Sequence, residues 1–226
     1  MEALGDILLP YKGPIGLVTR IVTMGQMFSG AFMCYDFYKE GSTKGMGIMP
    51  FMGGLIMGIL NLKFGFILRD DTMIQVNFFG ISLSIIYLMI YYFYSTEKGK
   101  VWLQLGMGGA FCAALVAYAE MEDPKIIETR FGTIITVFMF YLIASPLFHL
   151  KDIIKYKSTE GMPFPLIFSG TIVTFMWLLY GIILKNQFLV LQNVVAFVLC
   201  GFQLSLFAIY PSKPKSKEKV KAKKTN

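Results

Sequence analysis

Seven apolar segments, each about 20 residues long, follow one another along the 226-residue chain between short clusters of charge. A helix of about 20 apolar residues is long enough to cross the ~30 Å hydrocarbon core of a bilayer. Only 15% of the residues are charged, whereas about a quarter are charged in soluble domains. We therefore predict an all-α integral membrane protein with seven transmembrane helices. The predicted spans are 15–37, 46–68, 73–94, 101–119, 130–150, 163–184 and 188–210.

Lysines and arginines predict the orientation of these spans. With seven spans, the loops 39–45, 95–100 and 151–162 share a side with the C-terminal tail, and this side carries 14 of the 21 basic residues. The positive-inside rule then places the tail in the cytosol and the N-terminus outside. We expect a multi-pass protein of the plasma membrane whose basic tail contacts anionic lipid. The Golgi and the endoplasmic reticulum are the alternatives, because the final Lys-Lys-x-x resembles a retrieval signal.

The chain repeats itself at an offset of 116 residues. Between positions 29 and 77, 15 of 49 residues are identical to the residue 116 positions later, where average residue usage would give about three to five. An even number of spans separates the two copies, so both copies have the same orientation. Spans one to three therefore repeat as spans five to seven, and span four is a linker helix in a 3+1+3 arrangement.

This arrangement predicts the organisation of the chain and points to a carrier. Transporters built from repeated bundles bind substrate near the bilayer midplane at the interface between repeats. The predicted parts are an extracellular N-terminus at 1–14, a first triple-helix bundle at 15–94, an inversion linker helix with its loops at 95–129, a second bundle at 130–210 and a basic cytosolic tail at 211–226.

Polar residues at matched positions of the two repeats are the candidate substrate-binding residues. Asn77 and Asn193 are equivalent, and an amide both donates and accepts hydrogen bonds, which suits a hydroxyl-rich ligand. The alternative is hydrogen bonding between helices. Asn61 and Trp177 are also equivalent. An indole ring can stack on the C–H face of a sugar, although helix packing is an equally good interpretation.

Helix-weakening residues gather near the predicted cytosolic side. Pro50, Pro146 and Pro163 each remove a backbone hydrogen-bond donor, and Gly30 stands where Pro146 stands in the second repeat. They predict hinges, and the alternative is ordinary prolines tolerated within spans. On the third span, the tyrosines at 87, 91 and 94 predict a stripe of interfacial anchors.

Several chemistries lack the residues that they need. No acid lies near the middle of a predicted span, so no proton or sodium relay is expected. There is no phosphate-binding glycine loop and no nucleophile–base pattern. The cysteines at 34, 112 and 200 lie in separate spans, and the one histidine stands alone, so no metal site is expected. We predict a passive carrier that is not an enzyme and has no cofactor, no metal and no nucleic-acid partner.

Motifs in both halves resemble the SWEET family of sugar transporters, and the resemblance covers about 15–211. Gly30 in place of the first-span proline is similar to the animal branch of the family. The second half carries Ser145-Pro146, KST (157–159), MPF (162–164), WLLYG (177–181) and QLSLFAIYP (203–211), and the first half carries GST (41–43), MPF (49–51), FGFILRDD (64–71) and VNFFG (76–80).

The resemblance implies a bidirectional uniporter that moves mono- or disaccharides by facilitated diffusion and alternating access, often as a homo-oligomer. It also implies a tetrad of hinge prolines, of which Gly30 replaces one. The resemblance further implies an outer gate, formed by Phe64 with Asn186 and by Tyr180 with Asp70. Phe64 and Asn186 cannot form the tyrosine–aspartate hydrogen bond that is usual in the family. The implied substrate-binding residues are Asn77, Asn193, Trp177 and Asn61, and the implied hinge positions are Gly30, Pro50, Pro146 and Pro163.

Two other classes fit the sequence less well. A proton-coupled amino-acid carrier of the Pro-Gln-loop type, from an organelle membrane, would have Pro-Gln after the first and fifth spans and a membrane acid. This chain has Pro-Phe at both places. A seven-helix signalling receptor would not need the internal repeat, and the loops are too short for a G-protein surface.

Overall fold

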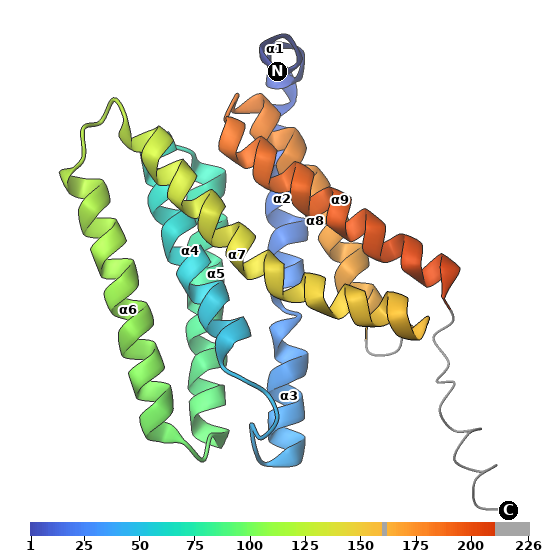
Figure 1. Ribbon diagram of the computed structural model, residues 1–226. Coiled ribbons are helices and arrows are strands. Elements are labelled where there is room, and N and C mark those ends of the chain that lie inside the picture. Colours follow the sequence, from blue (N-terminus) through green and yellow to red (C-terminus); the bar gives the residue numbers. More distant parts are fainter. Residues whose placement is uncertain (160–161, 211–226) are drawn as a thin grey trace, which may run out of the picture.

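The computed structural model describes residues 1–159 and 162–210, with side chains described except at 144–152 and 156. All regular secondary structure in the described residues is helical (Figure 1). The predicted cytosolic tail, 211–226, lies outside the described residues. The helices are α1 (Glu2–Leu8), the 3-10 helix η1 (Leu9–Tyr11), α2 (Lys12–Met27), α3 (Gly30–Glu40), α4 (Met49–Leu68), α5 (Asp71–Tyr94), α6 (Lys98–Met121), α7 (Ile127–Tyr156), α8 (Phe164–Ile183) and α9 (Gln187–Ile209).

The helices agree with the predicted spans except at the first one. Among the described helices, α4, α5, α6, α8 and α9 are long and apolar enough to cross a membrane, and α7 covers the predicted fifth span. The first span is divided between α2 and α3 by a break at Phe28 and Ser29. Ser29 and Gly30 are weak helix formers, so this part of the chain tolerates an interruption where one helix was expected.

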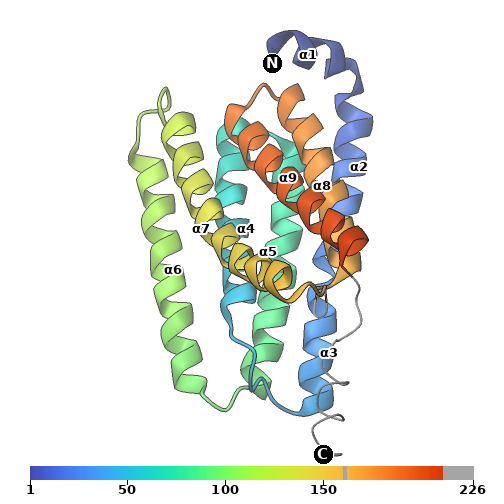
Figure 2. The ribbon, with the colours of Figure 1, turned by 45° about the vertical axis from the view of Figure 1, so that its right-hand side comes forward.

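The helical bundle has two ends. We call the end where α1 lies the α1 end, and the opposite end, where α3 terminates, the α3 end (Figures 1 and 2). The turns between α4 and α5 and between α8 and α9 lie at the α1 end. In both views α3, α5 and α6 extend further toward the α3 end than α7, α8 and α9 do.

Both repeats use the same order of helices. In the first repeat, α5 packs against α4 on one side and against α2 and α3 on the other. In the second repeat, α9 packs in the same way between α8 and α7. The two halves meet where α2 packs on α8 and where α4 packs on α7, and α6 packs against the outside of α4. The internal repeat of the sequence is therefore also a repeat of the packing.

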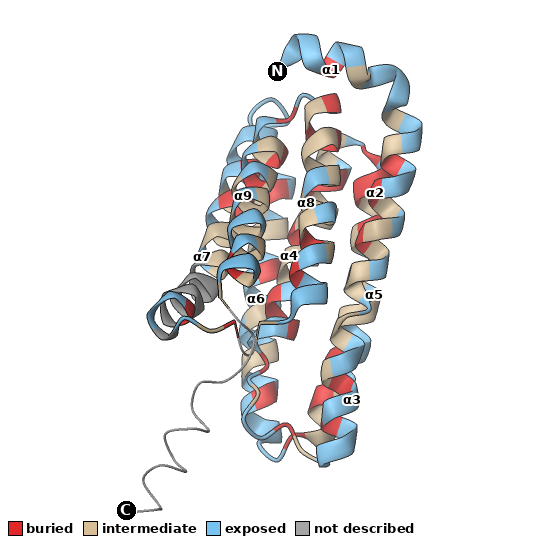
Figure 3. Ribbon diagram, turned by 90° about the vertical axis from the view of Figure 1, so that its right-hand side faces the viewer, coloured by how far each residue is buried: buried red, intermediate tan, exposed pale blue. Residues whose placement is uncertain are grey.

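The outer surface of the bundle suits lipid. Exposed residues cover the outward faces of the helices (Figure 3), and many of them are large and apolar, including Phe93, Trp102 and Tyr141. Apolar patches of this extent are unusual on proteins surrounded by water. Lipid therefore replaces water as the solvent of this surface.

The short helix α1 lies across the α1 end and is fastened to the second repeat. A Cβ atom on Gly5 would lie only 2.8 Å from the carbonyl oxygen of Ile182, so glycine permits this close approach. Lys185 Nζ donates to Asp6 Oδ1 at 2.6 Å. The hydrogen bond to Asp6 raises the pKa of Lys185 and so favours the charged form of its ammonium group.

Candidate functional site

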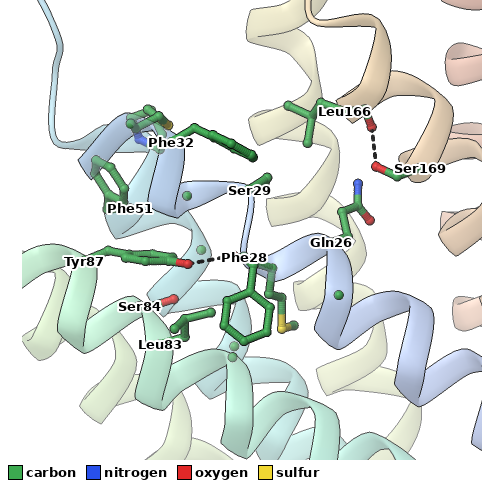
Figure 4. A pocket seen from close by; sticks show the side chains of 18 of the residues that line it. Gln26, Phe28, Ser29, Phe32, Phe51, Leu83, Ser84, Tyr87, Leu166 and Ser169 are labelled. Carbon is green, nitrogen blue, oxygen red and sulfur yellow. Dashed lines mark hydrogen bonds between the residues drawn. The ribbon is translucent and has the colours of Figure 1, made fainter. Parts of the chain in front are cut away.

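A cavity of about 1370 Å³ lies between the two halves (Figure 4). Its lining comes from α2, α3, α4, α5 and the first part of α8. It extends from Asn61 and Asn77 to Phe32 and Leu166, which are exposed toward the α3 end. Typical ligand pockets measure about 300–1000 Å³, so this cavity is large enough for a small hydrophilic substrate and its water.

At the α1 end, a buried polar contact joins the two halves above this cavity. The Tyr180 hydroxyl donates to Asp70 Oδ2 at 2.8 Å, and both residues are at most 3% exposed. Asp70 Oδ1 accepts the backbone N–H of Met73 and so caps α5. Lys12 Nζ lies 3.3 Å from Asp70 Oδ2. The described chain is therefore closed at the α1 end.

The repeat-related pair closes the same end by packing. Phe64 is fully buried and belongs to an apolar cluster with Met73 and Leu189. Asn186 caps α9 by accepting the backbone N–H groups of Phe188 and Leu189. All four residues that the resemblance assigns to the outer gate thus lie at the α1 end, and two of them, Tyr180 and Asp70, make a polar contact between the halves.

Asn61 and Asn77 both line the cavity. Each donates its side-chain N–H to the backbone carbonyl four residues earlier in its own helix, Asn61 to Met57 at 3.0 Å and Asn77 to Met73 at 2.8 Å. Within the described part of the chain, their side-chain oxygens accept no hydrogen bond. These oxygens are therefore able to accept a hydroxyl group of a ligand.

Asn193 and Trp177 are placed differently. Neither is among the described residues that line the cavity, although Asn193 bonds to Leu189 in the same way as Asn77 bonds to Met73. The Trp177 indole N–H donates to the Thr23 hydroxyl at 2.9 Å and so links α8 to α2. The ring of Trp177 also meets Tyr180 edge-on at 5.8 Å. The hydrogen bond of Trp177 therefore connects the two halves one helical turn further from the α1 end than Tyr180.

Three of the four predicted hinge positions line the part of the cavity nearest the α3 end. Gly30, Pro50 and Pro163 line it. Pro50 lies in the first turn of α4 and Pro163 is the N-cap of α8, so these prolines stand where helices begin and no backbone donor is lost. Pro146 lies inside α7, and its side chain is outside the described residues.

The prediction that the tyrosine stripe is an interfacial anchor is wrong for two of its members. Tyr87 and Tyr91 are 8% and 7% exposed and belong to the core near the α3 end. The Tyr87 hydroxyl donates to the carbonyl oxygen of Met27, the last residue of α2, at 3.1 Å (Figure 4). A Cβ atom on Gly30 would overlap the Tyr87 ring. Both tyrosines also have a polar partner inside the protein, which sequence spacing alone did not indicate.

Sequence reasoning also missed polar residues of the lining. Gln26, Ser29, Ser84 and Ser169 all face the cavity (Figure 4). Gln26 makes no side-chain hydrogen bond within the described part of the chain. Its repeat-related residue is Leu142, so a search for matched polar positions could not find it. The sequence signal that could have identified Gln26 is its position as a polar residue within the apolar span 15–37.

Comparisons with known proteins bear on this site. A family model described as a sugar efflux transporter for intercellular exchange matches the chain twice, over 13–99 and over 129–215. The two matches are 116 residues apart, the offset of the internal repeat. This arrangement confirms that the chain contains two copies of one unit.

Curated relatives match over most of their length. The sugar transporter SWEET1 of Drosophila pseudoobscura pseudoobscura is 32% identical over 197 residues, which cover 84% of this chain and 86% of the relative. The bidirectional sugar transporter SWEET9 of Arabidopsis thaliana is 30% identical over 207 residues, covering 89% and 80%.

A solved structure has the same fold. The 3.7 Å structure of a eukaryotic SWEET transporter superposes with a TM-score of 0.83 and covers 92% of this chain and 100% of its own. The sequence identity is 22%, so this likeness concerns the fold. It confirms the predicted fold class, seven transmembrane helices in a 3+1+3 arrangement.

Proposed function

Because the chain belongs to the SWEET family of sugar transporters, we propose that it moves mono- and disaccharides in both directions by facilitated diffusion. The observation that carries the proposal is the cavity between the two halves, which Asn61 and Asn77 line with side-chain oxygens that accept no hydrogen bond from the described residues. Its volume of about 1370 Å³ gives no steric reason to exclude a disaccharide.

We propose that transport follows alternating access between the triple-helix bundles 15–94 and 130–210, with 95–129 as the linker. The present state, closed at the α1 end, is one of two. The other state requires loss of the hydrogen bonds from Tyr180 to Asp70 and from Trp177 to Thr23, which join described residues of the two bundles. The hinges are Gly30, Pro50, Pro146 and Pro163, where helices begin, break or contain a proline.

The second repeat contributes to the proposed site when the α3 end closes. In the present state Asn61 and Asn77 face the cavity, while Trp177 is bonded to Thr23. Opening the α1 end frees the Trp177 indole, which can then stack on the sugar. Asn193, the repeat mate of Asn77, completes the polar surface of the site.

Proton coupling receives no support from the cavity. The described lining residues include no aspartate, glutamate or histidine. A passive carrier is therefore favoured over the amino-acid carrier of the Pro-Gln-loop type.

We further propose that the α1 end faces the outside of the plasma membrane, because the basic loops at 39–45 and 95–100 belong to the α3 end. Homo-oligomers are expected from the family.

The test is sugar flux through the purified full chain in liposomes. Labelled glucose and sucrose are followed in both directions at pH 5.5 and pH 7.5, with Asn77→Ala, Asn193→Ala and the control Gln104→Ala on the linker helix α6. We expect saturable flux that changes less than about twofold with pH, and a loss of about fivefold or more in the two asparagine variants, since each loses at least one hydrogen bond. Absence of sugar flux, or flux only with a proton gradient, would contradict the proposal.

A further inference from the structure

The same contact recurs at the α1 end of each repeat, but with different charges. In the first repeat, Lys12 Nζ lies 3.3 Å from Asp70 Oδ2. In the second, Asn186 Nδ2 donates to Glu128 Oε1 at 3.0 Å. Lys12 and Glu128 are 116 residues apart, and so are Asp70 and Asn186. Each pair joins the start of the first helix of a repeat to the N-cap residue of its third helix.

Only the first of these pairs touches the contact that closes the α1 end. Asp70 Oδ2, the oxygen nearest Lys12, also accepts the Tyr180 hydroxyl from the other half at 2.8 Å. The residue equivalent to Tyr180 is Phe64, which has no polar atom to offer Asn186. A charged pair, Lys12 and Asp70, therefore supports the contact between the halves at only one of the two repeat-related places described.

The first turns of α2 are packed against the same contact. Gly16, one turn after Lys12, approaches both Thr72 and Tyr180, and a Cβ atom there would lie 3.1 Å from each side chain. Thr19 and Thr23 continue this buried face of α2 toward Trp177. Lys12 is therefore held beside the closure by the packing of its own helix.

The carboxylate of Asp70 needs this cation when the α1 end is closed. Asp70 is 3% exposed, and a buried carboxylate is costly unless it is paired and hydrogen-bonded. Among the described residues, Lys12 is the cation within ion-pair distance of Asp70. The Lys12 side chain is 44% exposed, so it keeps much of its own hydration. When the halves separate and water reaches Asp70, the attraction is screened and contributes less.

We propose that Lys12 is a positioning residue of the α1-end closure, which holds the Asp70 carboxylate in place for Tyr180 and so favours the state closed at the α1 end. The inference rests on the proposed function, because a shift between the two states matters only in an alternating-access carrier. Glu128, the repeat-related residue, has no equivalent effect, since among the described residues its partner Asn186 bonds only within its own half.

A buried cysteine can report on the closure. Thr19 is fully buried, is not among the described residues that line the cavity, and donates its hydroxyl to Ile15 in its own helix. In the Thr19→Cys chain, reconstituted without sugar in lipid nanodiscs, a water-soluble maleimide reaches the thiol when the α1 end opens. The native cysteines are measured in the chain without Thr19→Cys, and their labelling is subtracted.

The expected result is a labelling rate about threefold to tenfold higher in Lys12→Met, as for loss of a half-buried ion pair. Lys12→Arg should label like the parent because it keeps the charge, and Glu128→Gln is the matched control and should also label like the parent. In an Asp70→Asn background, Lys12→Met should have no further effect. If Lys12→Met does not fold, Lys12→Gln against Lys12→Arg makes the same comparison.

Equal labelling of Lys12→Met and the parent, or an equal rise in Glu128→Gln, would overturn the inference. The proposed function is tested separately by sugar flux. If sugar flux is normal and Lys12→Met labels like the parent, only the role of Lys12 is refuted. If Lys12→Met labels faster but the chain transports no sugar, only the proposed function is refuted.

Discussion

The first spans of the two repeats begin alike and then differ. In the first repeat the span is interrupted at Phe28 and Ser29, with Gly30 directly after the break. In the second, α7 continues as one helix of 30 residues through Pro146, the residue equivalent to Gly30. The repeat that contains the stronger helix breaker is therefore the continuous one, which shows that local helix propensity does not decide where a span is interrupted.

Tertiary contacts explain the break in the first repeat. α2 packs both against α8 of the other half and against α5 of its own half, whereas α3 packs mainly against α5. The Tyr87 hydroxyl bonds to the Met27 carbonyl that the break leaves at the end of α2, and the Tyr87 ring lies where a side chain on residue 30 would be. The two parts of the first span thus have different neighbours, since α2 also contacts the other half, and Tyr87 stabilises the point where they part.

The two gate pairs at the α1 end differ because Tyr180 donates a hydrogen bond to Asp70, whereas Phe64 has no hydroxyl group for Asn186. Tyr180→Phe makes the polar gate pair resemble the pair of Phe64 and Asn186. It removes a hydrogen bond to a buried carboxylate, which is worth about 1.5–3 kcal/mol. We expect the labelling rate of Thr19→Cys to rise more than about tenfold, the largest change among these variants. An unchanged rate would mean that packing alone closes the α1 end.

The contrast between Gly30 and Pro146 gives the second prediction. Gly30→Ala places a methyl group against the Tyr87 ring, and overpacking of this kind costs about 1–3 kcal/mol. We expect a lower thermal unfolding temperature of the purified protein, with recovery in the double variant Gly30→Ala, Tyr87→Leu. Gly25→Ala is the matched control, because a Cβ atom there meets nothing within 4 Å. Equal stability of the two single variants would refute the packing argument.

The smallest expected effect comes from the Tyr87 hydroxyl. Tyr87→Phe keeps the ring against Gly30 and removes only the hydrogen bond to the Met27 carbonyl. Loss of such a bond costs about 0.5–1.5 kcal/mol. We expect faster backbone amide exchange at 28–32 with little change elsewhere in the chain, measured by hydrogen–deuterium exchange. Tyr94→Phe is the control on the same helix, and a similar change in both variants would show that the effect is not specific to the break.

Much of the candidate site could be read before the fold was known. Asn61 and Asn77 were selected as polar residues at repeat-matched positions within apolar spans, and both face the cavity. Tyr180 and Asp70, assigned through the family resemblance, are hydrogen-bonded to each other. Asn61 and Asn77 could be found because a polar group in an apolar span needs a partner or a cavity, and this requirement is visible in sequence.

Other parts of the site depended on contacts between distant segments. The bond from Trp177 to Thr23 joins residues 154 positions apart, and Tyr87 meets Met27 across 60 positions. Gln26 has no polar repeat mate, so the symmetry of the sequence concealed it. The long apolar helices carry little difference between their faces, so periodicity does not show which side meets lipid and which meets the other half.

The sequence by itself determined the class of the molecule. The length and low polarity of the segments require a bilayer, and the offset of 116 residues requires two parallel copies around a linker helix. Both conclusions depend only on local composition and on the number of spans between the copies. Only the tertiary structure decided where the first span breaks, that Trp177 bonds to Thr23 of the other half, and how Lys12 meets Asp70. These features depend on the relative placement of helices, and that placement is fixed by packing among many residues far apart in the chain.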